Sequence, residues 1–132
     1  MKYLCMIYVD EARLADAPAD HVATVEGACL EFADTLQKDG HLVASERLAP
    51  VQAATTVRHR NGHLAITDGP FAETKEQLGG FYLIEARDLN EAIRIAGAIP
   101  PGEFGCIEVR PVAPLTVLSE GETHALHDHR QG

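Results

Sequence analysis

The chain has 132 residues, of which 45% are hydrophobic and 23% charged, proportions typical of one globular domain with a packed core. Its formal net charge is −9, from 20 acidic against 11 basic residues without a local Lys or Arg cluster, which argues against nucleic acid as a partner. No apolar run approaches the roughly 20 residues that cross a bilayer and no secretory leader is recognisable, so we expect a cytoplasmic protein that does not bind membranes.

The first predicted element is a buried strand at Lys2–Val9, where β-prone hydrophobic residues follow one another without a helix breaker. A polar, alanine-rich connection is expected at residues 10–18. An amphipathic helix is predicted next, because apolar residues from Val22 to Leu36 recur at steps of three and four. Pro18 suits the start of this helix, and Gly40 suits the left-handed residue that ends it.

The middle of the chain has the periodicity of strands. We predict strands at Leu42–Leu48, Ala54–Arg60 and His63–Thr67. The last two are joined by Asn61-Gly62, a two-residue sequence that strongly favours a β-hairpin. Asp68-Gly69-Pro70 then forces a turn, because proline lacks an amide donor and biases the preceding glycine away from the helical region.

The last third of the chain predicts a strand at Phe81–Glu85, a short helix and a final strand at Gly105–Val109. Asp88 and Glu91 form a capping-box-like start for the helix, and Pro100-Pro101-Gly102 ends it.

The order of these elements predicts an α+β fold of the ferredoxin-like βαββ(β)αβ type, with an antiparallel sheet and a hairpin strand added in the middle. Both helices should cover one face of this sheet. The opposite face, with residues such as Leu83 and Ile107 or their alternating neighbours, is left uncovered in one copy. A second copy is the simplest cover, so we predict a homodimer. The domain is placed at residues 1–114, followed by a polar, His-containing tail at residues 115–132.

Three cysteines, Cys5, Cys29 and Cys106, are far apart in the sequence and embedded among apolar residues. Without a CxxC pair or a secretory context, this pattern favours reduced core thiols over a catalytic or metal-binding role.

Histidines give two further candidates for metal chemistry. His124, His127 and His129 in the tail have a chelating spacing, but ordering a flexible tail costs entropy, which favours adventitious binding over a functional site. His59 and His63 flank the predicted hairpin turn, where two further ligands are lacking, so we interpret them as exposed. No GxGxxG or GK[ST] sequence supports a nucleotide site. We therefore predict no metal and no cofactor.

Residues 68–82, DGPFAETKEQLGGFY, resemble the signature stretch of the DGPF branch of the YCII-related family. The opening MKYLCMIYVDE, the ASERLAP of residues 44–50 and the IEVRPV of residues 107–112 resemble the same family in the same order. This resemblance implies a dimeric α/β barrel built on the ferredoxin-like fold. Such proteins are largely uncharacterised, are often encoded beside extracytoplasmic-function sigma factors, and are similar in fold to cofactor-free monooxygenases and a dehydrochlorinase.

The resemblance also implies a catalytic dyad of a histidine in the first helix with an aspartate, and His21 matches that histidine. A neutral imidazole serves as a general base when a carboxylate orients its other nitrogen. The alternative is that His21 is a partly exposed surface residue of the first helical turn.

Three aspartates are candidates for the partner of His21: Asp34, Asp39 and Asp68. Asp34 lies thirteen residues beyond His21, or roughly 20 Å along one helix, and Asp39 is further still. We therefore prefer Asp68 as the second catalytic residue. The alternative for Asp68 is structural, because aspartates before Gly-Pro commonly bond their own backbone and fix the turn.

Phe71, Glu73 and Lys75 follow on the same loop, and we predict that they bind substrate, the alternative being a solvated lip of the cleft. Two functions are consistent with these residues. The first is a cofactor-independent enzyme in which His21 moves a proton on a small organic molecule and Asp68 orients it. The second is a non-catalytic small-molecule binding or interaction module linked to sigma-factor regulation.

Overall fold

A computed structural model describes residues 1–115 of the chain. Helices (α), 3-10 helices (η) and strands (β) follow in the order β1 (Lys2–Val9), α1 (Glu11–Asp16), α2 (Ala19–Lys38), β2 (Leu42–Arg47), η1 (Val51–Ala53), β3 (Thr55–Arg60), β4 (His63–Asp68), β5 (Gln77–Glu85), α3 (Leu89–Gly97), η2 (Pro100–Phe104) and β6 (Gly105–Pro111). The predicted tail and its three histidines lie outside the described residues.

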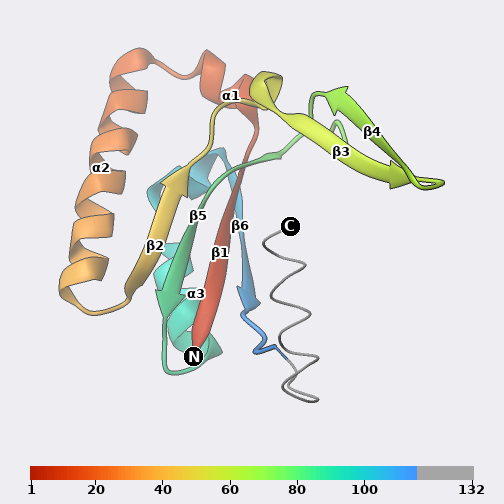
Figure 1. Cartoon of the computed structure of the whole chain (residues 1–132). Helices are drawn as coiled ribbons and strands as arrows, with labels where there is room; N and C mark the ends of the chain where they lie inside the picture. The colour runs from red at the N-terminus through yellow and green to blue at the C-terminus, as the bar shows by residue number, and fades with distance from the viewer. Residues whose placement is uncertain (116–132) are drawn as a thin grey trace.

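Four strands form one antiparallel sheet in the order β2-β5-β1-β6 (Figure 1). Numbered by themselves along the chain, these strands have the order 2-3-1-4 with one helical crossover before the second and one before the fourth. This arrangement is α+β and agrees with the predicted ferredoxin-like pattern. β1 is a central strand of this sheet. Its neighbours on both sides, β5 and β6, come from the second half of the chain.

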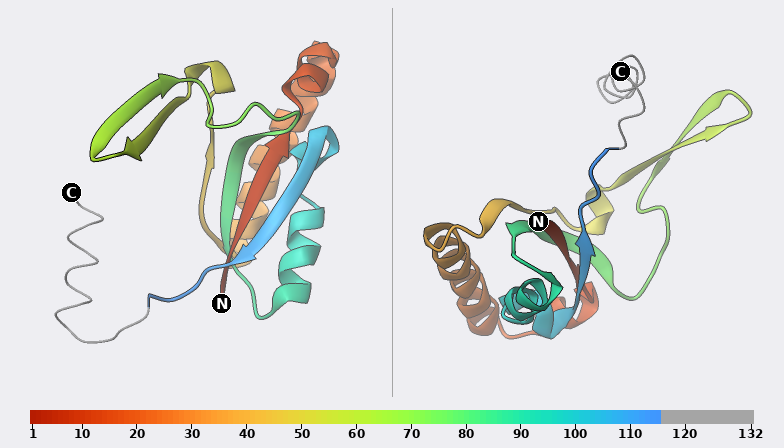
Figure 2. Two further views of the ribbon diagram at one scale, coloured as in Figure 1. Left: turned by 90° about the vertical axis from the view of Figure 1, so that its right-hand side faces the viewer. Right: turned by 90° about the horizontal axis from the view of Figure 1, so that it is seen from below.

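Helices α2 and α3 cover one face of this sheet (Figure 2). Alternate residues of β1 point into the covered face, and Tyr3, Cys5, Ile7 and Val9 are buried there, whereas the residues between them are exposed or only partly buried. The rest of the core comes mainly from α2, β5, α3 and the turn before β6: Val25, Leu36, Tyr82, Ile84, Ala86, Ala92, Ile95, Ala96, Ile99 and Phe104.

The local signals for the helix ends are confirmed. Gly40 has φ +81°, the left-handed conformation expected after α2. The Asp88 side chain accepts a hydrogen bond from the Glu91 N–H at 2.9 Å and so caps α3. Residues 10–18, expected as a polar connection, instead contain α1, which begins because the Asp10 carboxylate accepts from the N–H groups of Ala12 and Arg13.

The expected hairpin forms, but the prediction that it adds a single strand to the sheet is wrong. β3 and β4 make a separate two-stranded sheet, here called the arm (residues 55–68), which projects away from the four-stranded sheet (Figures 1 and 2). Both edges of β5 are already paired, with β2 and β1, and η1 redirects the chain after β2. The hairpin thus cannot insert beside β5, and among residues 1–115 its two strands pair only with each other.

Two further expectations concerned side-chain placement, and the one about the cysteines needs correction. Leu83 lies on the open face of the sheet, opposite Leu4, whereas Ile107 packs against the covered core, so in β6 the alternating neighbours of Ile107 face the open side, as the sequence also allowed. Cys5 is buried, whereas Cys29 is half-buried and Cys106 is exposed, so only the first is a core thiol.

Within the described part of the chain, none of the helices has the length and apolar character needed to cross a bilayer.

Candidate functional site

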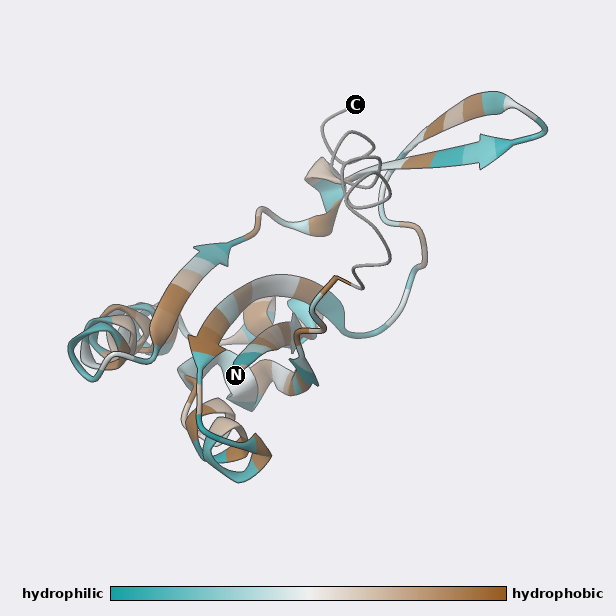
Figure 3. Ribbon diagram, turned by 60° about the horizontal axis from the view of Figure 1, so that its bottom comes forward, coloured by the Kyte–Doolittle hydropathy of each residue, from teal (hydrophilic) through white to brown (hydrophobic). Residues whose placement is uncertain are grey.

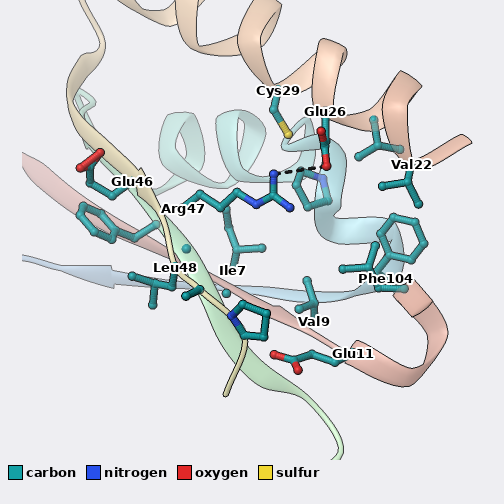
Figure 4. Close-up of a pocket in the computed structure, with 18 of the residues that line it drawn as sticks. Ile7, Val9, Glu11, Val22, Glu26, Cys29, Glu46, Arg47, Leu48 and Phe104 are labelled. Atoms are coloured by element: carbon teal, nitrogen blue, oxygen red, sulfur yellow. Dashed lines mark hydrogen bonds and ion pairs between the residues drawn. The ribbon is translucent and has the colours of Figure 1, made fainter. Parts of the chain in front are cut away.

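A cavity of about 1190 Å³ lies between α2 and the four-stranded sheet (Figure 4). Its walls are mostly apolar, with Ile7 and Val9 from β1, Val22 and Leu30 from α2, and Phe104 from η2. Pockets of this size and character are typical of small-molecule sites.

The cavity exists because one part of the sheet carries no side chains beneath α2. Gly79 and Gly80 of β5 form part of the floor. A Cβ on Gly80 would lie 2.9 Å from the Glu46 carbonyl oxygen, and one on Gly79 would lie 3.2 Å from a methyl of Val9. Close strand pairing therefore requires glycine at position 80, whereas a side chain at position 79 would need Val9 to shift, and the absence of both side chains leaves the space open.

One ion pair crosses the cavity from the sheet to the helix. Arg47 Nη1, at the end of β2, lies 3.2 Å from Glu26 Oε1 on α2 (Figure 4). Both side chains are more than half exposed, so the attraction between them is screened by water and each can exchange its partner for a polar group of a ligand.

Two weakly acidic groups lie near this ion pair. Burial raises the pKa of the Cys29 thiol, although the neighbouring Arg47 guanidinium acts in the opposite direction. Burial also raises the pKa of Tyr82 to about 12. Both groups are therefore protonated at neutral pH, and Cys29 lacks the thiolate character of a nucleophile.

The cavity adjoins a smaller hollow of about 560 Å³, which lies between α1, η1 and the loop of residues 69–76, here called the DGPF loop. The two share Glu11, Ala12 and Gln52 as lining residues. Glu11 fixes this junction, because its carboxylate accepts a hydrogen bond from the Val51 N–H at 3.2 Å and ties α1 to η1.

The predicted substrate-binding residues occupy different environments. Glu73 and Lys75 line the smaller hollow. Phe71 is 78% exposed. The structure thus brings two of these three residues to the junction between the DGPF loop and α1.

His21 lies beside the rim of the large cavity. Its Nε2 is 3.0 Å from Glu103 Oε2, and its ring packs edge-on against Phe104, with 6.1 Å between ring centroids. Because Phe104 lines the cavity, the imidazole is separated from it by one aromatic side chain. Both members of the His21–Glu103 pair are about half exposed.

The carboxylate bonded to the His21 imidazole is thus Glu103, rather than any of the three aspartates weighed from the sequence, and the Asp20 carboxylate accepts only from the His21 backbone N–H, at 3.0 Å. Asp34 pairs with Lys38 at 2.8 Å, and Asp68 lies at the base of the arm opposite Thr55. Glu103 is 82 residues from His21, so no local pattern connects them.

Topology supplies the only signal that could have identified Glu103. The end of β1 lies beside the start of β6, so the segments after β1 and before β6 meet at one end of the sheet. Backbone and side-chain bonds fix this meeting: the Asp10 N–H donates to the Phe104 carbonyl at 2.8 Å, and the Arg13 guanidinium donates to the Glu103 carbonyl at 2.9 Å.

Across residues 1–115, no group of three or more His, Cys, Asp or Glu side chains is arranged to hold a metal ion. The arrangement offers a mostly apolar binding volume with one exchangeable ion pair, and beside it an imidazole oriented by a carboxylate.

Comparison with known proteins shows which family and which relative this chain is similar to. The family model for the YCII-related domain matches residues 1–116. An uncharacterized protein of Rhizobium meliloti (strain 1021) is 49% identical over 76 residues, which cover 56% of this chain and 61% of that protein. The match thus spans about three fifths of that relative's length.

Proposed function

The chain belongs to the YCII-related domain family, and we propose a function from the geometry of its site: the protein binds a small organic molecule in the cleft between α2 and the sheet. The observation that carries this proposal is the cavity of about 1190 Å³ with mostly apolar walls and a single ion pair. Apolar walls with a few converging polar groups are the usual composition of a ligand site.

The polar groups define how such a ligand is oriented. Its apolar part lies over Ile7 and Val9 of β1, and its polar group exchanges with the Arg47–Glu26 ion pair. Cys29 on the same wall is protonated and offers only a weak donor. Binding therefore depends on burial of apolar surface, with orientation set by Arg47 and Glu26.

The test is to fill the cavity and measure binding of an apolar probe, 8-anilinonaphthalene-1-sulfonate, by calorimetry. Val22→Trp places a large ring in the cavity and should weaken binding by about tenfold or more, equivalent to about 1.4 kcal/mol. Ala23→Trp, at the exposed neighbouring position of α2, is the matched control and should keep the affinity within about twofold. Equal effects of the two variants would place the probe outside the cleft.

A second candidate function is acid–base catalysis by His21, favoured by the 3.0 Å contact between its Nε2 and Glu103. In the neutral ring, Nε2–H donates to the carboxylate and leaves Nδ1 as the free base nitrogen. The proposal gives Glu103 the orienting role first expected of Asp68. Asp68, which begins the Gly-Pro turn below the arm, remains a catalytic candidate to be tested beside it.

Nitrogen NMR of the His21 ring separates these two carboxylates without a known substrate. The neutral ring should be almost entirely in the Nε2–H form in the parent protein, and Glu103→Ala should lower the share of this tautomer to that of a free histidine ring in water. Asp68→Asn should leave the tautomer unchanged. If Asp68→Asn and not Glu103→Ala changes it, Asp68 is the orienting carboxylate.

The non-catalytic alternative, a binding module linked to sigma-factor regulation, predicts that His21→Ala keeps probe affinity within a few-fold.

We also propose that the protein is a homodimer joined through the open face of the sheet. This face carries apolar side chains on the two central strands, which are only partly covered in one copy: Leu4, Met6, Tyr8, Phe81 and Leu83. Light scattering should give a mass near twice that of the 14.3 kDa chain. Leu83→Glu should reduce it to the mass of one chain, because a charge would be buried at the centre of the interface.

A further inference from the structure

Among residues 1–115, the arm lacks the packing that normally stabilises a two-stranded hairpin. A two-stranded antiparallel hairpin alone in water is marginally stable at best. Its base is fixed by the Gly69 N–H donating to the Ala54 carbonyl at 2.7 Å and by the Thr56 hydroxyl donating to the Gly69 carbonyl at 2.8 Å. Beyond this base, the two strands project from the body of the protein (Figure 1).

One face of the arm is apolar. The register places Val57 opposite Ile66 and His59 opposite Leu64, so these four side chains share a face. Val57, Leu64 and Ile66 are 54%, 56% and 64% exposed. Figure 3 shows the resulting hydrophobic bands along the arm. Three large aliphatic side chains on one face of an exposed ribbon mark an interaction surface.

The charge of the arm favours an acidic partner. Its other face carries Arg58 and Arg60, whereas Asp68, the arm's only acidic residue, lies at the base on the same face as Ile66. The chain as a whole has a net charge of −9. A second copy of the same chain therefore has a net charge opposite to that of the two arginines, which favours its approach to the arm.

The position of the arm agrees with this partner. It leaves the body on the side of the sheet away from α3, the same side as the open apolar face (Figure 2). A copy docked on the open face would thus lie on the side into which the arm projects.

We propose that the apolar face of the arm, formed by Val57, Leu64 and Ile66, docks on a second copy of this chain. The proposal rests on the homodimer put forward above and adds a contact that the sheet faces alone do not provide. In a two-fold symmetric dimer each arm makes the same contact, so the two arms contribute together. Burial of the three aliphatic side chains then supplies the packing that holds the hairpin together.

Sedimentation equilibrium of two adjacent charge variants tests this contact. Ile66→Asp places a charge on the apolar face and should raise the dimer dissociation constant by about tenfold or more. Thr67→Asp adds the same charge to the same strand on the opposite face and should change it by no more than about threefold.

Because an aspartate in either strand could loosen the arm itself, the parent protein is also tested directly. In a dimer assembled from isotope-labelled and unlabelled copies, NMR should detect nuclear Overhauser effects between one copy and the methyl groups of Val57, Leu64 and Ile66 of the other. A monomeric parent protein would overturn both the homodimer and this inference. A dimer that shows no such contacts and equal effects of the two variants would overturn this inference alone.

Discussion

The four-stranded sheet and the arm are built from the same kind of antiparallel pairing, but their side chains lie in opposite environments. In β1 every second side chain is buried beneath the helices. In β3 and β4 no residue is buried. The difference lies outside the strands: α2 and α3 cover the sheet, whereas no other described element covers the arm. An alternating pattern thus identifies a strand without showing whether its apolar face is covered.

Two isoleucines, one in the sheet and one in the arm, show this difference in burial for single side chains. Ile84 of β5 is fully buried beneath the helices, and Ile66 of β4 is 64% exposed. Ile84→Ala should lower the free energy of unfolding by about 2–5 kcal/mol, because it leaves a cavity in a packed core. Ile66→Ala should change it by no more than about 0.5 kcal/mol at concentrations where the protein is monomeric. Urea denaturation measures both, and similar losses would mean that the arm is part of the core.

The sequence predicted the features whose causes are local. Asn61-Gly62 adopts the positive φ angles that a tight hairpin requires, and Asp88 caps its own helix. Both signals depend on atoms within a few residues, so one sequence is sufficient to find them.

The sequence could not predict features that depend on distant segments. The hairpin itself was expected, but its separation from the sheet depends on which strands occupy the edges of β5. The pairing of His21 with Glu103 depends on the meeting of two chain segments 82 residues apart. The cavity likewise arises from Gly79 and Gly80 lying under α2, a relation that no short pattern records.

The N-terminal cap of α3 extends the comparison between the sheet and the arm. α3 is one of the two helices that cover the sheet, and no described helix covers the arm. The Asp88 carboxylate satisfies the Glu91 N–H at the first turn of this helix. Asp88→Ala should destabilise the protein by about 1 kcal/mol, whereas Asp88→Asn, which retains a capping oxygen, should have an effect of only a few tenths of a kcal/mol. Urea denaturation at neutral pH measures the two variants. Equal losses would show that charge, not the capping hydrogen bond, stabilises the start of α3.

The smallest effect is expected from Glu91, the buried carboxylate that follows this cap. A hydrogen bond from the Arg87 N–H, at 2.9 Å, and the guanidinium groups of Arg87 and Arg94 lower the pKa of Glu91 below its ordinary value of 4.5, although burial opposes them. A carboxylate whose pKa is lower in the folded state stabilises the fold above its unfolded pKa, and this contribution is lost as the pH falls through the folded pKa.

The unfolding free energy should therefore decrease below about pH 4.5 in the parent protein, and part of this decrease should be absent in Glu91→Gln, which cannot titrate. The expected difference is small because both arginine side chains are largely exposed, so water and salt screen their attraction for the carboxylate. Urea midpoints from pH 3 to pH 7 at low salt measure it, and 0.5 M NaCl should reduce it, since about that concentration screens charges within a few ångströms. Parallel pH profiles for the two proteins at low salt would show that Glu91 stabilises α3 as a hydrogen-bond acceptor rather than as a charge.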